Sequence, residues 1–190
     1  LEQQIIELVM QQYPTQSSSY QRWGINLSAN ALMNNAFMIW LERQLLKDSI
    51  IAANLVFEMD EELLDCNLAA STRLFEMLRR VGSRSCISKF GKGLASFRLY
   101  RELKPDYIKL DPSLINVLER DHTSQQFIRM IVEVSHRLGC VVIAEGVETI
   151  AQKQLLESLF IDAIQGYLIA RPSPLSQAIT GLPESGSLPL

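Results

Sequence analysis

The stretch that decides the fold is SQQFIRMIVEVSHRLGCVVIAEG, residues 124–146. Its first part predicts a helix over 124–138, because apolar side chains recur on one helical face. These side chains are Phe127, Ile131, Val134 and Leu138. Gly139 is a typical helix C-cap, and the run CVVIAEG that follows (140–146) predicts a strand. A helix that passes through a glycine into a short apolar strand is typical of parallel α/β proteins.

The same alternation extends over the rest of the chain. Five further strands are predicted at 23–28, 54–59, 84–88, 106–110 and 162–167. Four further helices are predicted at 1–12, 31–46, 68–80 and 149–159. The apolar runs are short and often β-branched, as expected of parallel strands that helices cover. The sequence therefore predicts an α/β fold.

The number of strands leaves two architectures open. A closed (β/α)₈ barrel has eight strands and typically about 250 residues, whereas six strands are predicted in the 190 residues of this chain. The chain also opens with a helix, which in a barrel should follow a strand. Either one or two βα units of a barrel lie upstream and are missing, or the protein is an open six-stranded doubly wound sheet.

The composition limits the range of partners and compartments. The formal charge is −3, from 18 basic and 21 acidic residues, so nothing suggests binding to nucleic acid or to an anionic membrane surface. Apolar residues make up 47% of the chain, but no stretch approaches the roughly 18 apolar residues of a membrane span. There is no signal-peptide pattern. Cys66, Cys86 and Cys140 lack metal-binding spacing, which indicates reduced thiols in the cytoplasm.

Polar or charged residues follow every predicted strand at its carboxyl end. They are Asn26, Ser28, Glu58, Asp60, Glu61, Glu62, Ser88, Lys89, Lys109, Asp111, Glu145, Glu148 and Gln165. One such residue is most often a helix N-cap or a solvated loop position. In a barrel, however, all of them converge at one rim, where active sites form. Carboxylates and an amide that can hold a divalent metal, together with lysines that can meet phosphate oxygens, indicate a site for a phosphate ester.

Six short motifs follow one another along the chain: NLS (26–28), EMDE (58–61), KFGKG (89–93), KLD (109–111), AEGVET (144–149) and QGY (165–167). In this order and spacing, they resemble the EAL domain, a family of bacterial cyclic di-GMP phosphodiesterases and their non-catalytic receptor relatives. The resemblance covers about residues 1–178, with 179–190 as a tail or linker. It implies a TIM-like (β/α)₈ barrel of the EAL type that lacks its N-terminal one or two βα units.

The resemblance also implies roles for individual residues. Asn26 and Glu58 match ligands of the first metal, Lys109 matches a lysine that helps activate water, and Glu145 matches a carboxylate at the metal site. Gln165 matches a residue that orders the site. The implied ligand-binding set is Asn26, Glu58, Lys89, Lys109, Asp111, Glu145, Glu148, Gln165, Gly166, Arg171 and Pro172. Loop support is implied for Glu61, Phe90, Gly91 and Gly93.

Two positions depart from the family pattern. The paired aspartates that hold both metals in active members fall on Ser88 and Lys89. A serine is a weak neutral ligand, and a protonated lysine repels a cation. At about 4 Å and an effective dielectric near 20, a unit charge pair is worth about 4 kcal/mol, and a divalent ion doubles that. We therefore expect no two-metal hydrolysis: Glu58, Lys109 and Glu145 are remnants of a catalytic site, with no required cofactor, and Mg²⁺ or Mn²⁺ matters only if residual activity exists.

The resemblance therefore indicates a degenerate, LapD-like receptor that binds cyclic di-GMP in signal transduction, such as biofilm control. It would pass the signal to attached domains or to a regulatory protein, with homodimerisation as one arrangement. Such a domain is cytoplasmic and can be the cytoplasmic part of an inner-membrane protein. Two other functions stay open: a CsrD-like protein-interaction scaffold that binds no nucleotide, and a weak phosphodiesterase.

Overall fold

The structure is a computed structural model that describes residues 1–13, 21–92 and 96–174. Gly93 and the expected tail at 179–190 lie outside the described residues. Among the helices of the described part of the chain, none has the length and apolar character needed to cross a membrane.

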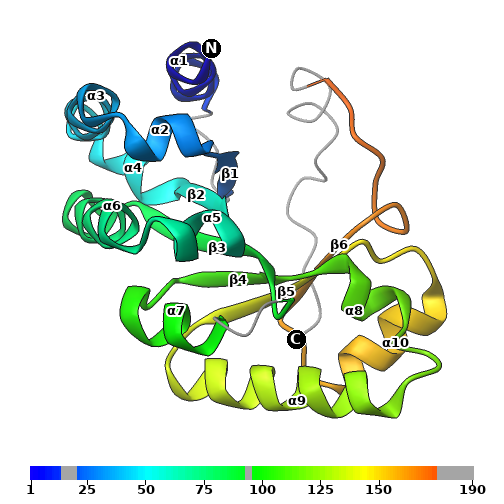
Figure 1. Cartoon of the computed structure of the whole chain (residues 1–190). Helices are drawn as coiled ribbons and strands as arrows, with labels where there is room; N and C mark the ends of the chain where they lie inside the picture. Colours follow the sequence, from blue (N-terminus) through cyan, green and yellow to red (C-terminus); the bar gives the residue numbers. More distant parts are fainter. Residues whose placement is uncertain (14–20, 93–95, 175–190) are drawn as a thin grey trace.

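The described residues form one sheet of six parallel strands (Figure 1). The strands are β1 Trp23–Asn26, β2 Leu55–Asp60, β3 Arg84–Phe90, β4 Tyr107–Leu110, β5 Val141–Glu145 and β6 Ala163–Gln165. Each strand pairs with its neighbours in sequence, in the order β1-β2-β3-β4-β5-β6. A doubly wound sheet would reverse this order at a switch point. The uninterrupted order and the curl of the sheet confirm the partial TIM-like barrel and exclude the open doubly wound alternative.

Helices cover the convex face of the curled sheet (Figure 1). The longer ones are α1 Glu2–Gln12, α3 Asn35–Leu45, α6 Leu68–Val81, α7 Ser96–Leu103, α9 His122–Arg137 and α10 Ile150–Ser158. Short helices fill the connections: α2 Ala29–Met33, α4 Ser49–Asn54, α5 Glu61–Cys66 and α8 Pro112–Asn116. The main core lies between the strands and this helical layer.

Side chains alternate between the two faces of each strand. Phe57 and Ile108 point to the helical layer and are fully buried in the main core. The concave face carries a second, small apolar cluster of Val56, Cys86 and Tyr107. This cluster forms the floor of the barrel interior, and the carboxyl ends of the strands rise above it.

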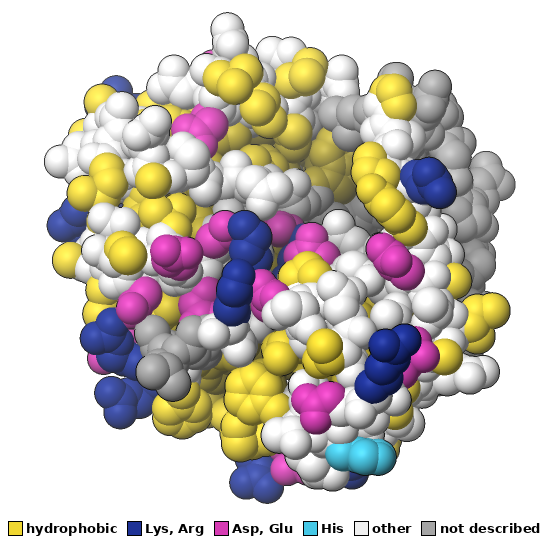
Figure 2. Space-filling model, turned by 45° about the vertical axis from the view of Figure 1, so that its right-hand side comes forward, with side chains coloured by type: hydrophobic (Ala, Val, Ile, Leu, Met, Phe, Trp, Pro, Cys, Tyr) yellow, Lys and Arg dark blue, Asp and Glu magenta, His cyan; other side chains and the backbone are white. Residues whose placement is uncertain are grey.

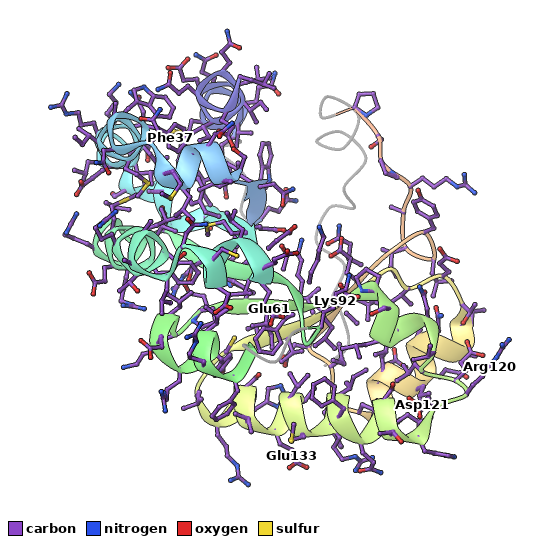
Figure 3. The ribbon with its side chains drawn as sticks, viewed as in Figure 1. Phe37, Glu61, Lys92, Arg120, Asp121 and Glu133 are labelled. Atoms are coloured by element: carbon purple, nitrogen blue, oxygen red, sulfur yellow. The ribbon has the colours of Figure 1, made fainter. Side chains whose placement is uncertain are left out.

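Two predicted elements differ from the structure. The helix expected over 31–46 is two helices, because Asn34 has an extended backbone and its side chain accepts a hydrogen bond from the Phe37 N–H at 3.0 Å, which starts α3. Phe37 then points into the helical layer (Figure 3). The strand expected over 84–88 continues to Phe90, so Lys89 belongs to the strand together with Ser88. The other strand limits differ from the expected ones by one or two residues.

Candidate functional site

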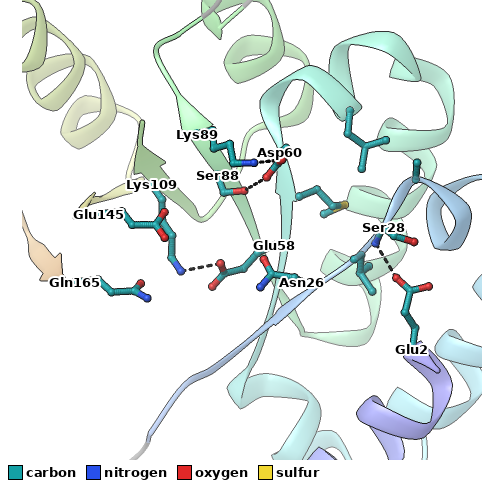
Figure 4. Close-up of a pocket in the computed structure, with 14 residues that line it drawn as sticks. Glu2, Asn26, Ser28, Glu58, Asp60, Ser88, Lys89, Lys109, Glu145 and Gln165 are labelled. Atoms are coloured by element: carbon teal, nitrogen blue, oxygen red, sulfur yellow. Dashed lines mark hydrogen bonds and ion pairs between the residues drawn. The ribbon is translucent and has the colours of Figure 1, made fainter. Parts of the chain in front are cut away.

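A pocket of about 560 Å³ opens at the carboxyl ends of the strands (Figure 4). Its lining residues are Glu2, Asn26, Leu27, Ser28, Ala29, Glu58, Met59, Asp60, Leu63, Ser88, Lys89, Lys109, Glu145 and Gln165. Figure 2 shows basic side chains near the centre of one face of the molecule, with acidic side chains around them. The pocket is therefore lined by charges of both signs.

The strand register brings these side chains together. Asn26 pairs with Glu58 across β1 and β2, and Glu145 pairs with Gln165 across β5 and β6. Glu58 follows Val56 by two residues, so it shares the concave face with the apolar floor. Residues that are far apart in sequence thus meet above one floor because parallel strands end at the same edge.

A buried ion pair lies at the base of the pocket. Lys109 Nζ is 2.7 Å from Glu58 Oε2, and the two side chains are only 12% and 9% exposed. Beside Glu58 on the next strand, burial and then the negative charge of Glu58 raise the pKa of the Cys86 thiol, which stays protonated at neutral pH. The lysine of one strand therefore neutralises the carboxylate of another inside the barrel.

The two substituted positions lie at an irregularity in β3. The register between β3 and β4 shifts between Ile87 and Phe90, and Lys89 adopts a left-handed backbone with φ of 52°. Regular alternation would turn Lys89 away from the neighbouring Ser88. The β-bulge instead lets both side chains reach the pocket.

One carboxylate holds both of these side chains. Asp60 Oδ2 lies 2.6 Å from Lys89 Nζ, and Asp60 Oδ1 accepts a hydrogen bond from Ser88 Oγ at 2.9 Å. Burial alone would raise the pKa of Asp60, but the hydrogen bonds from Lys89 and Ser88 outweigh it and lower that pKa. The hydrogen bond and the charge of Asp60 in turn raise the pKa of Lys89. Both groups are therefore ionised at neutral pH.

The segment after β3 is held by Glu61 at the start of α5 (Figure 3). The buried Glu61 accepts a hydrogen bond from the Gly91 N–H at 2.9 Å. Gly91 has φ of 93°, a left-handed conformation that favours glycine. The preceding Phe90 is buried and packs edge-on against Tyr100. These contacts fix the backbone that carries Ser88 and Lys89.

Several expected site residues do not line the pocket. Asp111 is buried and caps α8 through the Ser113 N–H at 2.9 Å. Glu148 is exposed, and Pro172 is exposed beyond β6. Arg171 lies over the ring of Tyr167, 5.4 Å from its centroid.

Gly166, also expected at the site, is a point of close backbone approach. A Cβ there would lie 2.2 Å from the Val147 carbonyl oxygen. The backbone after β6 therefore lies directly against the backbone after β5. Gly166 contributes to the site by allowing this close contact.

Two charged residues that line the pocket, Asp60 and Glu2, were missing from the expected binding set. Asp60 appeared only as a polar residue after a strand, and its spacing gave no sign that it would hold Ser88 and Lys89. Glu2 accepts a hydrogen bond from the Ser28 N–H at 2.7 Å and fixes the β1–α2 connection at the pocket mouth. This contact joins residues 26 positions apart, so no local pattern could reveal it.

The donor set does not fit a two-metal centre. Within the residues that the structure describes, no group of three or more His, Cys, Asp or Glu side chains is placed to hold a metal ion. Two of the pocket carboxylates, Glu58 and Asp60, each face a lysine ammonium group instead. We therefore assign no catalytic step to bound metal.

The EAL domain model matches residues 1–172, which is most of the chain. This chain belongs to the EAL family. Among curated proteins, it is 30% identical over 158 residues to MucR of Pseudomonas aeruginosa, a bifunctional diguanylate cyclase/cyclic di-GMP phosphodiesterase. It is also 30% identical over 154 residues to the cyclic di-GMP phosphodiesterase PdeF of Escherichia coli. These matches cover 83% and 81% of this EAL chain but only 23% and 21% of the relatives, so the chain spans less than a quarter of their length.

Solved structures agree with this assignment. The EAL chain matches Vibrio cholerae LapD bound to c-di-GMP with a TM-score of 0.80 and 26% identity, covering 88% of this chain and 41% of that one. It matches the PaMucR phosphodiesterase in complex with c-di-GMP with a TM-score of 0.74 and 30% identity, covering 83% of this chain and 64% of that one. The EAL domain described here is thus related to cyclic di-GMP phosphodiesterases and to LapD.

Proposed function

We propose that this EAL domain binds cyclic di-GMP without hydrolysing it and acts as a receptor. The observation that carries the proposal is the Lys89–Asp60 ion pair at 2.6 Å. It sets an ammonium group where the family has a metal-binding aspartate. A cation that is part of the protein repels divalent metal but attracts phosphate oxygens. Mg²⁺ or Mn²⁺ is required only if residual activity exists.

The pocket has the size and the groups for such a ligand. Its volume of about 560 Å³ lies within the range of small-molecule sites. Cyclic di-GMP carries two phosphodiester charges, and the pocket offers two ammonium groups, on Lys89 and Lys109. Relatives of 30% and 26% identity were solved with c-di-GMP bound. The ligand would therefore meet fixed positive charge in place of metal.

The remaining charges limit the affinity. Four carboxylates also line the pocket, on Glu2, Glu58, Asp60 and Glu145. Because both lysines are paired with two of these carboxylates, a dianionic ligand has to compete for them. We expect a dissociation constant of about 10–100 μM, or roughly −6.8 to −5.5 kcal/mol. The four carboxylates outnumber the two ammonium groups of the pocket. This excess of negative charge favours the second candidate, a CsrD-like scaffold that binds no nucleotide.

A receptor has to pass the binding of its ligand on to another domain or protein. Ligand binding can act only by favouring one of two arrangements of this domain and a partner. We propose attached domains of the same polypeptide, a regulatory protein or a second copy of the domain as that partner, as in a LapD-like protein. The inner membrane and biofilm control are the setting that this likeness suggests.

The test is calorimetric titration of cyclic di-GMP into the protein with EDTA present, and again with Mn²⁺. We expect heat of binding in EDTA and no linear dinucleotide product in Mn²⁺. Lys89→Ala should weaken binding about tenfold, whereas Lys153→Ala, on the exposed face of α10, should not change it.

Each other outcome identifies a different function. Absence of binding up to about 100 μM ligand would support the scaffold. Turnover in Mn²⁺ that Glu58→Ala abolishes would support the weak phosphodiesterase, and it would overturn the receptor proposal.

A further inference from the structure

Gly24 occupies the middle of β1, next to the Glu58 carboxylate. It pairs with Val56 in regular parallel register, and its backbone is not in the left-handed region. The backbone conformation at this position would therefore accept residues other than glycine, proline excepted. A glycine within a strand often marks the close approach of another group.

That group is the Glu58 side chain. A Cβ at position 24 would lie 2.2 Å from Glu58 Oε1 and 3.1 Å from Glu58 Cδ. The nearest three atoms all belong to this one flexible side chain, and none belongs to the backbone. The carboxylate thus occupies the space that any other residue at position 24 would fill.

The strand register shows which way Glu58 points. Its partner on β1 is Asn26, but its Oε1 atom lies against Gly24, two residues closer to the amino end of the strand. The carboxylate is therefore folded back into the barrel interior. Its other oxygen, Oε2, lies 2.7 Å from Lys109 Nζ, which reaches across from β4 (Figure 4).

We propose that Gly24 is a positioning residue that keeps the Glu58 carboxylate retracted and so lowers the affinity of the pocket for divalent cations. This effect is separate from the replacements at Ser88 and Lys89. A methyl group at position 24 would drive the carboxylate out of its recess, away from the amino end and toward Asn26 and the pocket. There it is an anionic oxygen ligand of the kind that Mn²⁺ and Mg²⁺ bind.

The experiment is a titration of the whole protein with Mn²⁺ alone. The concentration of free Mn²⁺ is measured at each step by electron paramagnetic resonance. Gly24→Ala should bind Mn²⁺ about tenfold more tightly than the parent protein, because the Glu58 carboxylate would then extend toward Asn26 instead of folding back against position 24. The matched control adds Glu58→Gln to Gly24→Ala. This double variant keeps the size of side chain 58 but removes its negative charge, so the gain in Mn²⁺ affinity should vanish.

Folding supplies a second readout. If Gly24→Ala unfolds at a lower temperature than the parent, adding Glu58→Ala should restore the melting temperature, because Glu58 is the group that the new methyl meets. An unchanged Mn²⁺ affinity in a folded Gly24→Ala protein overturns the proposal. So does an unfolded variant that Glu58→Ala does not rescue. The inference concerns the pocket of the proposed receptor, but its readout involves no nucleotide, so either proposal can fail alone.

Discussion

The Nζ atom of Lys89 lies 2.6 Å from Oδ2 of Asp60, and the other oxygen of that carboxylate accepts a hydrogen bond from Ser88. Asp60 is thus the common partner of Ser88 and Lys89, the two positions to which the resemblance assigns the paired aspartates of active family members. The ammonium group neutralises the acid, and the acid holds the ammonium group at the pocket. Asp60 and any bound ligand therefore compete for the ammonium group of Lys89.

The first prediction concerns this competition. Asp60→Asn removes one negative charge from the pocket and frees Lys89, so cyclic di-GMP should bind about tenfold more tightly, a gain of ~1.4 kcal/mol. Calorimetry in EDTA measures the change. Glu157→Gln removes the same charge from the exposed end of α10 and should leave the affinity unchanged. Equal affinities of Asp60→Asn and the parent would show that Lys89 does not meet the ligand.

The second prediction is a pH dependence of stability. The folded pKa of Asp60 is lowered, so the stability that its ionised form contributes is present above its unfolded value of about 3.9 and is lost as the pH falls through the folded value. The folded pKa of Lys89 is raised, so its contribution is present below about 10.4 and is lost as the pH rises through its folded value.

Both contributions are present at pH values between these two limits. Urea denaturation of the parent and of Lys89→Met checks this pH range. Since the Lys89 and Asp60 side chains are 56% and 44% exposed, the difference in unfolding free energy should be at most about 1 kcal/mol between pH 5 and 9. It should shrink as the pH falls through the folded pKa of Asp60, because the protonated acid no longer attracts Lys89. A difference that stays undiminished at the acid end of the titration would mean that Lys89 stabilises the fold by another contact.

The third prediction contrasts a buried and an exposed ion pair. Lys109→Met leaves the Glu58 carboxylate buried without its cation and should cost about 3 kcal/mol of unfolding free energy. Lys153→Met breaks an exposed pair on α10 and should change stability by less than about 0.5 kcal/mol. Urea denaturation at pH 7 measures both. Similar losses for the two variants would indicate that water reaches Glu58.

The fourth prediction concerns restoration of metal binding. The double substitution Ser88→Asp with Lys89→Asp brings two carboxylates beside Asp60 and should tighten Mn²⁺ binding at least about tenfold. Position 89 has a left-handed backbone, which Asp and Asn tolerate well. Ser88→Asn with Lys89→Asn is therefore the matched neutral control. If acid and amide pairs bind Mn²⁺ equally, charge at these positions does not govern the affinity.

The sequence predicted the main elements of the fold because apolar periodicity distinguishes strands from helices. The helix predicted at 124–138 is α9 His122–Arg137, and the strand after Gly139 is β5. Short capped helices escaped prediction. In α8, Asp111 caps the helix and Pro112 follows it directly, so a residue expected in the binding set begins a helix instead. The strand count could not separate a barrel from an open sheet, because pairing order is a long-range property.

From the sequence, the site could be predicted only as a group of polar side chains at the carboxyl ends of the strands. Sequence reasoning placed Asn26, Glu58 and Lys109 at one rim, and the structure brings them to one pocket. It could not predict which charges pair, since Lys89–Asp60 and Lys109–Glu58 join residues 29 and 51 positions apart. The recess at Gly24 also depends on side-chain direction, which spacing alone does not give.

The contacts of Asp60 with both Ser88 and Lys89 also limit which single substitutions these two positions tolerate. Changing Lys89 alone to aspartate would set two like charges against each other at the bulge, and changing Ser88 alone would replace a hydrogen-bond donor of Asp60 with another acid. Each of these single substitutions therefore adds an uncompensated acid beside Asp60. A carboxylate at position 88 or 89 is tolerated without loss of stability only where a cation balances it.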